Sequence, residues 1–289
     1  MTEKDLYTEY KGVYVPKHLH PPQSLKYAEE FEFRPDDILI VTYPKSGTTW
    51  MQEMVPLIMS EGDLTPVLTV PNWDRVPWLE EHRAIVLNLE DRPAPRIFAT
   101  HFHYHMMQQS YFKNKPKVIY VMRNPRDVFV SSYHYYGMAS YLVKPGTLDE
   151  FLMKFINGKV MFGSWFDHVK GWLNAKNQDL IMYITYEEMI WDLKESVSKL
   201  ANFLGKSLSP ELIGKIAEHC TFKNMKQNNM SNYSLVPQEF MDQNKSAFLR
   251  KGICGDWKNH FTVAQAEWLD SVYKEEMKDV KFKFMWDEQ

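Results

Sequence analysis

The sequence lacks several features that mark specialised classes of protein. It contains only two cysteines, Cys220 and Cys254, which excludes a disulfide framework and favours a reduced, cytoplasmic protein. No apolar run approaches the roughly 18 residues that a membrane-spanning helix needs, and the polar start MTEKDLYTEYKG does not resemble a signal peptide. With 34 basic and 37 acidic residues, the chain has no excess of positive charge, which argues against a general nucleic-acid binder.

The sequence also has no Ser/Gly-rich linker, charge block or internal repeat. Its composition, 44% hydrophobic and 25% charged, is that of an ordinary globular protein and excludes a disordered or collagen-like chain. We therefore expect one domain over residues 1–289.

Three short apolar runs alternate with helical periods. They cover residues 38–41, 118–122 and 180–184. Runs that are apolar on both faces are typical of buried parallel strands. The sequence therefore predicts an α/β fold in a single domain, with a central parallel β-sheet flanked by helices.

Apolar residues at spacings of three and four predict one helical stripe after the third run. The stripe consists of Ile190, Leu193, Val197, Leu200 and Leu204. Gly205 follows where a helix would end. Residues 223–248 are rich in Asn, Gln, Ser and Met and weakly periodic, which predicts a binding loop or lid.

A phosphate-binding loop is predicted at YPKSGTTW, residues 43–50, between the first apolar run and a helical period. The first amides of a helix have no partners within it and carry partial positive charge, so they bind anions. Gly47 permits close approach of the backbone, and Lys45 adds a full charge. The alternative is a capped helix start with a surface lysine.

This loop is P-loop-like but is not a Walker A loop, because its lysine precedes its only glycine. The second apolar run ends in Arg123, and no aspartate at the strand ends is placed to hold magnesium. A nucleotide bound here is therefore expected to be neutralised by side-chain cations without a metal.

Two further segments carry candidate phosphate ligands. Arg123 is a forked donor suited to a phosphate, and Ser131 lies about two helical turns beyond it. Arg126 and Asp127 are expected to be surface charges at a helix start. The segment that begins at Arg250 places two adjacent cations ahead of Gly252 and forms a candidate cradle.

Together, YPKSGTTW, RNPRDVFVSSY and RKGxxGDW resemble the cytosolic sulfotransferase family over essentially the whole chain. The resemblance implies transfer of a sulfuryl group from 3'-phosphoadenylyl sulfate (PAPS), leaving PAP, without a metal. It implies that the donor's 5'-phosphosulfate is cradled by Lys45, Ser46, Gly47, Thr48, Thr49 and Trp50. Its 3'-phosphate would be held by Arg123, Ser131, Arg250, Lys251 and Gly252. The nucleotide's remaining neighbours would be Tyr186, Cys220, Thr221, Phe222 and Met225 around the adenine, Trp50 stacked on it, and Phe248 and Leu249.

The catalytic base is expected among three alternating histidines, His101, His103 and His105. If the segment were extended, all three would face one side, and a zinc site would be an alternative; two of the three are expected to face solvent. Sulfuryl transfer needs a base for the acceptor hydroxyl and a cation at the leaving oxygen. The family's interval before the Arg123 strand selects His101 as base, with His103 second and Lys45 as the cation. Ser131 completes the predicted catalytic set.

The acceptor pocket is predicted from VPNWDRVPWLE, which places Trp73 and Trp78 in one loop. Core packing is the alternative for these two side chains. The W-x-R-x-P-W pattern is similar to the hydroxysteroid branch of the family, as are MSNYSL and GSWFDH. We therefore expect a flat, apolar hydroxyl acceptor, with Trp73, Trp78, His101 and Tyr233 in its wall.

A homodimer follows from the resemblance. The family's short dimer motif, KxxxTVxxxE, matches Lys258, Thr262, Val263 and Glu267. The alternatives to a steroid sulfotransferase are a phenol-type sulfotransferase, a magnesium-dependent kinase that shares the strand–loop–helix, and a non-catalytic nucleotide or steroid carrier.

Overall fold

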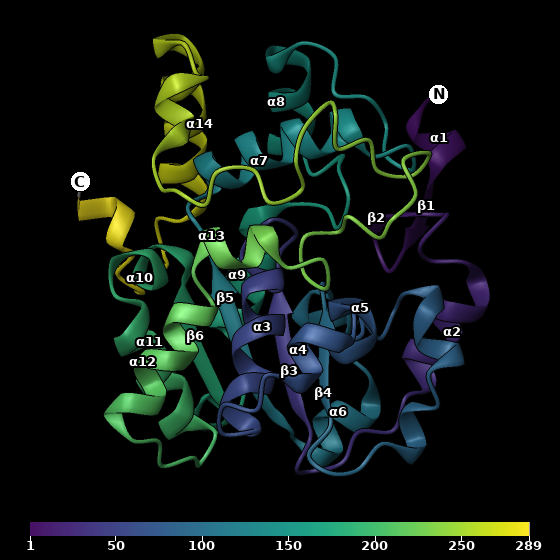
Figure 1. Cartoon of the computed structure of the whole chain (residues 1–289). Helices are drawn as coiled ribbons and strands as arrows, with labels where there is room; N and C mark the ends of the chain where they lie inside the picture. Colours follow the sequence, from purple (N-terminus) through teal and green to yellow (C-terminus); the bar gives the residue numbers. More distant parts are fainter. Residues whose placement is uncertain (289) are drawn as a thin grey trace.

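The computed structural model describes residues 1–288 and builds them around a parallel sheet (Figure 1). Its four strands are β3 (Ile38–Thr42), β4 (Ile97–Thr100), β5 (Lys117–Met122) and β6 (Ile181–Thr185). They lie in the order β4-β3-β5-β6, and each adjacent pair is parallel. Every residue of β3 is buried, as its continuous apolar sequence predicts for a strand covered on both faces. The predicted α/β fold is confirmed.

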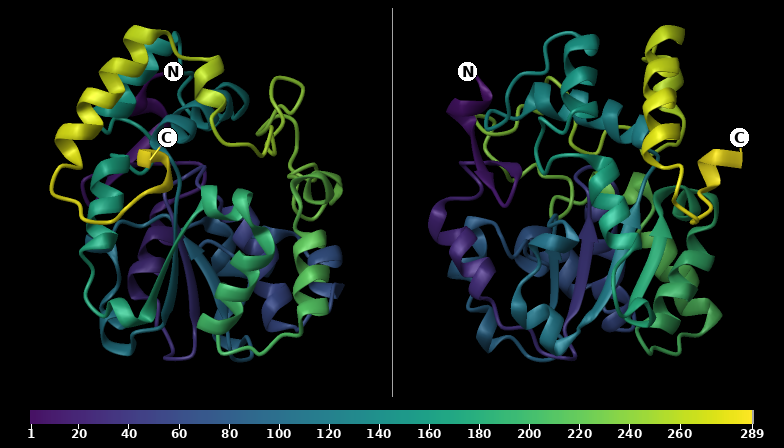
Figure 2. Two further views of the ribbon diagram at one scale, coloured as in Figure 1. Left: turned by 90° about the vertical axis from the view of Figure 1, so that its left-hand side faces the viewer. Right: turned by 180° about the vertical axis from the view of Figure 1, so that it is seen from behind.

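The helices cover both faces of this sheet, and Figure 2 shows them on either side of the strands. Those before β5 are α1 (Glu3–Leu6), α2 (Pro22–Glu30), α3 (Thr48–Met59), α4 (Thr65–Thr69), α5 (Asn72–Arg75) and α6 (Gln109–Asn114). Those after β5 are α7 (Pro125–Met138), α8 (Leu148–Ile156), α9 (Trp165–Leu173), α10 (Tyr186–Trp191), α11 (Leu193–Phe203), α12 (Pro210–His219), α13 (Phe222–Gln227) and α14 (Val263–Glu276).

The remaining regular elements are short. An antiparallel hairpin pairs β1 (Tyr7–Tyr10) with β2 (Val13–Pro16). The 3-10 turns are His82–Val86, Leu89–Asp91, Tyr104–Met106, Gln178–Leu180, Asp256–Asn259 and Met285–Glu288. In the part of the chain that the structure describes, no helix is long and apolar enough to cross a membrane.

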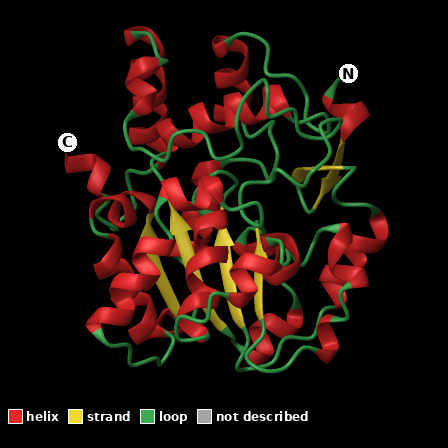
Figure 3. Cartoon of the chain, viewed as in Figure 1, coloured by secondary structure: helices red, strands yellow, loops and turns green. Residues whose placement is uncertain are grey.

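Above the carboxyl ends of the strands lie helices α7, α8 and α14, the β1–β2 hairpin and long connecting loops (Figure 3). Residues 228–255 contain neither a helix nor an extended strand, which agrees with most of the loop predicted over residues 223–248, but residues 223–227 belong to α13. In Figure 1 this yellow-green segment runs across the open end of the sheet. In open α/β sheets, ligands bind at this edge, so the fold places the covering segment over the expected site.

The structure corrects one predicted helix. Ile190 belongs to α10, and a new helix, α11, begins at Leu193. Asp192 between them is extended (φ −149°, ψ 92°), and its side chain accepts a hydrogen bond from the Glu195 amide. The apolar spacing runs across the break between the two helices because the capping residue, Asp192, is not one of the positions of the apolar stripe.

Three strands were not predicted, namely β4 of the parallel sheet and the two strands of the hairpin. The strand β4 has only four residues, and the hairpin strands β1 and β2 also have four each. Such short runs carry too little alternation to be separated from loops by pattern alone. β4 nevertheless pairs with β3 along its whole length, because Ile38–Val41 lie in register with Ile97–Thr100.

Candidate active site

All four strands deliver a candidate site residue directly after their carboxyl ends. The phosphate loop follows β3, His101 follows β4, Arg123 follows β5 and Tyr186 follows β6. Because the strands are parallel, these ends lie at one edge of the sheet. The topology therefore gathers residues that are far apart in the sequence.

The loop after β3 turns sharply into α3. Lys45 and Gly47 both have positive φ, 68° and 110°, and Gly47 is the residue that precedes the first turn of α3. The Lys45 ammonium lies 4.0 Å from the centre of the Phe248 ring and 4.8 Å from that of Tyr135. The helix start and the lysine are thus placed together, as an anion site requires.

Two further cations, Arg123 and Arg250, lie beside the Lys45 of this loop. Arg123 donates from Nη1 to the Lys45 carbonyl at 2.9 Å, and its guanidinium lies 4.1 Å from the centre of the Tyr186 ring. Burial, together with the charges of Arg123 and Arg250, lowers the pKa of Lys45 to about 7. The clustered positive charge favours an anionic ligand, because such a ligand would relieve the repulsion.

Asp256 holds the segment that begins at Arg250. Its carboxylate forms an ion pair with Arg250 at 2.8 Å and accepts a hydrogen bond from Lys251 at 2.8 Å. Burial opposes ionisation, but hydrogen bonds from Lys251, Asn259 and Arg250 outweigh it and hold the pKa of Asp256 well below its usual range. Asp256 therefore fixes both cations of the predicted cradle on one carboxylate.

Asp127 attaches the same segment to α7. Its side chain accepts from the amides of Gly255 (2.8 Å) and Trp257 (3.1 Å) and is only 2% exposed. The expectation that Asp127 is a surface charge is wrong, because the loop that contains Gly255 folds over it. Arg126 is not a free surface charge either, because its side chain is only 13% exposed, pairs with Asp270 and lies 5.2 Å from the centre of the Tyr273 ring.

His101 is held in one orientation. Its Nδ1 lies 2.8 Å from the Thr42 carbonyl, which can only accept, so Nδ1 carries the proton and Nε2 has the free lone pair. Its backbone amide donates to Glu80 at 2.7 Å. Burial lowers the pKa of His101 to about 4, so the imidazole is neutral near pH 7. It is therefore in the form that can accept a proton.

The other two alternating histidines do not share this position. β4 ends at Thr100, and residues 104–106 form a 3-10 turn, so the segment is not extended. His103 is buried and contacts the Phe162 carbonyl at 2.6 Å, while the exposed His105 contacts that of Lys11 at 3.1 Å. The expectation that two of the three face solvent is wrong for His103. No group of three His, Cys, Asp or Glu side chains within residues 1–288 is placed to hold a metal ion.

One cavity of about 410 Å³ joins these elements. The predicted residues that line it are Lys45, Gly47, Thr48, Thr49, Trp50, Trp73, Trp78, His101, Arg123, Ser131, Tyr186, Phe222, Met225, Tyr233, Phe248, Leu249, Arg250, Lys251 and Gly252. Cations and aromatic side chains adjoin in this lining, since Lys45 lies over Phe248 and Arg123 over Tyr186, and His101 lies in the same cavity. The structure therefore brings together nearly all of the residues that sequence reasoning selected.

Three predicted site residues stand outside the lining. Ser46 is fully buried, and its hydroxyl has no hydrogen-bond partner among the described residues. The Cys220 thiol is buried too, but its carbonyl accepts from Trp50 Nε1 at 2.9 Å. Thr221 caps α13 through the Asn224 amide. Cys220 and Thr221 thus act on the site through the backbone and through helix placement.

Sequence reasoning missed the groups that orient His101. His168 is fully buried, and its Nε2 lies 3.0 Å from the His101 carbonyl while its Nδ1 lies 2.7 Å from the Tyr120 hydroxyl. Burial raises the pKa of Glu80, which holds the His101 amide, to about 7. Glu80 and His168 lie in the VPNWDRVPWLE and GSWFDH segments, but no spacing within either segment indicates a contact with His101, because these contacts join segments distant in the sequence.

Comparisons with known proteins agree with this geometry. A family described as "Sulfotransferase domain" matches residues 35–281. Sulfotransferase 2B1 of Mus musculus is 50% identical over 97% of this chain and 83% of its own length. The 3-beta-hydroxysteroid sulfotransferase of Cavia porcellus is 43% identical over 96% of this chain and 97% of its own. The amine sulfotransferase of Oryctolagus cuniculus is 42% identical over 96% and 93%.

A solved structure has the same fold. Mouse sulfotransferase SULT7A1, complexed with PAP, superposes with a TM-score of 0.80 at 32% identity, covering 96% of both chains. A retinol dehydratase reaches 0.84 at 24% identity, which supports the fold alone. The α/β sheet with its phosphate loop defines the class, and this chain belongs to the sulfotransferase family.

Gly252 provides a test of how closely the cradle is packed. Its φ is +65°, and a Cβ there would lie 2.3 Å from Cδ2 of Phe222, which also lines the cavity. We expect Gly252→Ala to lower the free energy of unfolding by about 1–3 kcal/mol, measured by denaturant titration. Gly214→Ala is the control, because it lies within α12 and a Cβ there has its nearest neighbour at 4.0 Å. Equal effects of the two changes would contradict this packing.

Proposed function

We propose that this chain transfers the sulfuryl group of PAPS to the hydroxyl of a hydroxysteroid or similar apolar alcohol. One observation carries the proposal: a single cavity contains the cationic phosphate loop, the neutral His101 and an aromatic wall. The hydroxysteroid acceptor is supported by the 3-beta-hydroxysteroid and 3-alpha-hydroxysteroid sulfotransferases of Cavia porcellus, 43% and 41% identical to this chain. Acceptors of the phenol type are the less favoured class.

The cationic part of the cavity fits the doubly phosphorylated donor. Nε of Arg123 and Nε of Arg250 are buried and have no hydrogen-bond partner in the described chain. Such donors need an acceptor, and phosphate oxygens provide one. We assign the 3'-phosphate to Arg123, Ser131, Arg250, Lys251 and Gly252, and the 5'-phosphosulfate to Lys45 and the first amides of α3.

The nucleotide base is assigned to the aromatic side of the same half. Trp50 lies 5.4 Å from Tyr186 between ring centres and is held by the Cys220 carbonyl. Phe222 and Met225 come from α13 and line the cavity nearby. These side chains offer the apolar surface on which an adenine stacks, and Phe248 and Leu249 close the cavity beside them.

In the transfer step, His101 acts as the base. Its Nε2 takes the proton of the acceptor hydroxyl as the acceptor oxygen bonds to sulfur. The bond from sulfur to the bridging oxygen of the donor breaks, and the negative charge that develops there is stabilised by Lys45 and the amides of α3. Bound phosphate and sulfate charge favours the ammonium form of Lys45 and the proton gained by His101.

The acceptor half is assigned to Trp73, Trp78 and Tyr233. Trp73 and Tyr233 lie 5.3 Å apart between ring centres, and Trp78 lies 6.0 Å from His101. These rings form an apolar wall beside the base, which suits a rigid, flat alcohol.

Residues 1–289 are proposed to work as one cytoplasmic domain.

Replacing His101 tests the base. We expect His101→Ala to lower kcat for steroid sulfation by at least about 100-fold, because no group then accepts the hydroxyl proton. The affinity for PAP should change by less than about twofold, since His101 is not assigned to the phosphates. Both are measured by radiolabelled-sulfate transfer and by calorimetry. His103→Ala is the matched variant, and a greater loss of kcat there would overturn the assignment of His101.

The lowered pKa of Lys45 predicts a pH dependence of donor binding. The free protein loses the Lys45 proton as the pH rises through about 7, whereas an anionic nucleotide favours the protonated form. We therefore expect PAP affinity to fall between about pH 7 and pH 9 in the wild type. Lys45→Arg keeps its charge over this range and should give a flatter calorimetric profile. Parallel profiles for the two proteins would contradict the role of Lys45.

We also propose a homodimer through the segment of Lys258, Thr262, Val263 and Glu267. All four residues are exposed, and Val263 is 76% exposed although apolar. A lysine and a glutamate on either side of Val263 can cross-pair about a two-fold axis. Val263→Asp should reduce the mass in light scattering to that of one chain. Val86→Asp, at another exposed valine (64%), should leave the mass unchanged, and a dimer that survives Val263→Asp would exclude this interface.

A further inference from the structure

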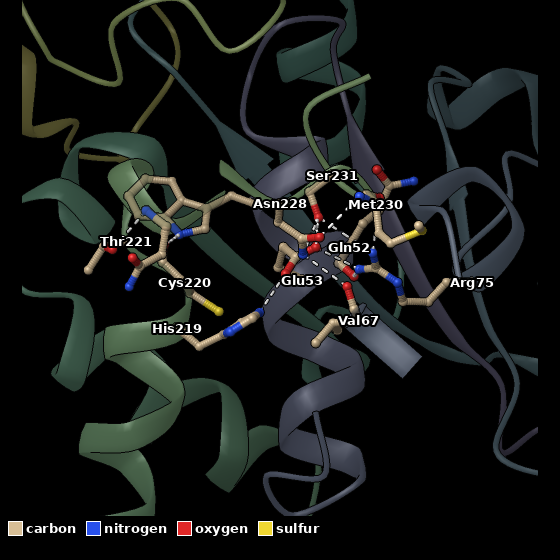
Figure 4. Close-up of polar contacts among 12 residues, drawn as sticks. Gln52, Glu53, Val67, Arg75, His219, Cys220, Thr221, Asn228, Met230 and Ser231 are labelled. Atoms are coloured by element: carbon tan, nitrogen blue, oxygen red, sulfur yellow. Dashed lines mark hydrogen bonds and ion pairs between the residues drawn. The ribbon is translucent and has the colours of Figure 1, made fainter. Parts of the chain in front are cut away.

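A buried carboxylate lies beneath the cavity and joins several segments (Figure 4). Glu53, on α3, has no exposed surface. It accepts from Arg75 Nη1 at 2.8 Å, from His219 Nε2 at 3.0 Å and from the Ser231 hydroxyl. In Figure 4 these side chains converge on Glu53 from different parts of the chain. None of them was selected as a site residue from the sequence, although Arg75 and Ser231 lie in the W-x-R-x-P-W and MSNYSL segments.

One arm of this cluster fixes the acceptor wall. Ser231 lies two residues before Tyr233, in the covering segment without helix or strand. Arg75 donates from Nη2 to the Met230 carbonyl at 3.1 Å, and the same carbonyl accepts from the Asn72 amide at 2.9 Å. Asn72 also donates to the Tyr233 hydroxyl at 3.3 Å. The place of Tyr233 therefore depends on bonds made by its neighbours to the Glu53 cluster.

The other arm fixes the nucleotide side. His219 is the last residue of α12, and the next residue, Cys220, accepts from Trp50 Nε1 at 2.9 Å. α13 begins two residues later and contributes Phe222 and Met225 to the cavity. Glu53 thus holds the junction between α12 and α13 at its His219 end. Trp50 and Glu53 lie one turn apart on α3, so both ends of this arm return to one helix.

The Glu53 cluster differs from an ordinary buried ion pair, because one of its hydrogen bonds holds a segment that has no regular secondary structure. A regular element would be held by its own backbone ladder, but residues 228–235 have turn bonds, the single backbone bond from Asn72 to Met230, and side-chain contacts. For such a segment, a hydrogen bond to a buried charge is a large share of what fixes its position. The loss of one such bond should therefore move the wall without unfolding the sheet.

We propose that Glu53 is a positioning residue for both substrates: its carboxylate holds the segment that presents Tyr233 to the acceptor and the junction that holds Trp50 beside the adenine. The inference rests on the proposed function for the identity of the two ligands. It predicts that the two arms can be weakened separately. Ser231 serves the acceptor, and His219 serves the nucleotide.

The test compares Ser231→Ala, His219→Ala and Glu53→Gln in steroid sulfation and in PAP calorimetry. Ser231→Ala should raise the KM for the steroid about tenfold, the effect of one lost hydrogen bond to a charge, and leave kcat and the Kd of PAP within about twofold. His219→Ala should weaken PAP binding about fivefold and leave the KM for the steroid within about twofold. Glu53→Gln should show both changes.

Two controls separate positioning from stability. Ser234→Ala removes an exposed hydroxyl in the same segment, bonded only to Asn229 at 3.2 Å. Ser209→Ala removes the cap of α12, the helix that ends at His219, without touching Glu53. Both should leave the KM for the steroid and the Kd of PAP unchanged, although Ser209→Ala lowers the Tm.

Removing charge from Glu53 leaves Arg75 buried without its partner, so Glu53→Gln can fail to fold. The Ser231 and His219 variants keep that ion pair and decide the question by themselves. The proposal is overturned if both variants bind steroid and PAP as the wild type does, or if they change only the Tm and kcat. A wild-type protein that sulfates no hydroxysteroid would instead refute the proposed acceptor, and the His219 effect on PAP would still test the nucleotide arm.

Discussion

Mutual repulsion among Lys45, Arg123 and Arg250 is the interaction on which the site depends. The strand ends and the Asp127-anchored loop hold these cations around one helix start, and their charges help to lower the pKa of Lys45 to about 7. Concentrated positive charge is unfavourable without an anion, so bound phosphate or sulfate oxygens stabilise this arrangement of cations. Asp256 neutralises part of this charge and keeps Arg250 and Lys251 in place.

The proposed base, His101, has the opposite electrostatic requirement. To act as a base it must be neutral and present one particular nitrogen, and the Thr42 carbonyl and burial provide both conditions. Glu80 holds the backbone amide of His101, and His168 holds its carbonyl. The neutral His101 and the clustered cations share one cavity, and the end of β3 serves both, because Thr42 holds the imidazole and the loop that follows carries Lys45.

The covering segment completes the cavity with side chains that have no regular structure behind them. Tyr233 and Phe248 come from it, and their ring centres are 3.9 Å apart. A segment of this kind can vary in shape while the sheet below it is unchanged. This division separates the strand-end groups around Lys45 from the segment that carries Tyr233, and the buried Glu53 contacts that segment through Ser231.

The sequence by itself determined three of the four parallel strands, the phosphate loop and the cations that follow the strands, because these are local patterns of apolar runs, turns and helix starts. The family resemblance added His101 and the donor residues. Only the tertiary structure revealed β4, separated His101 from His103, and buried Asp127 and Glu53 as anchors. Those outcomes depend on contacts between residues far apart in the chain, such as Glu53 with Ser231, and no spacing within a segment encodes such a contact.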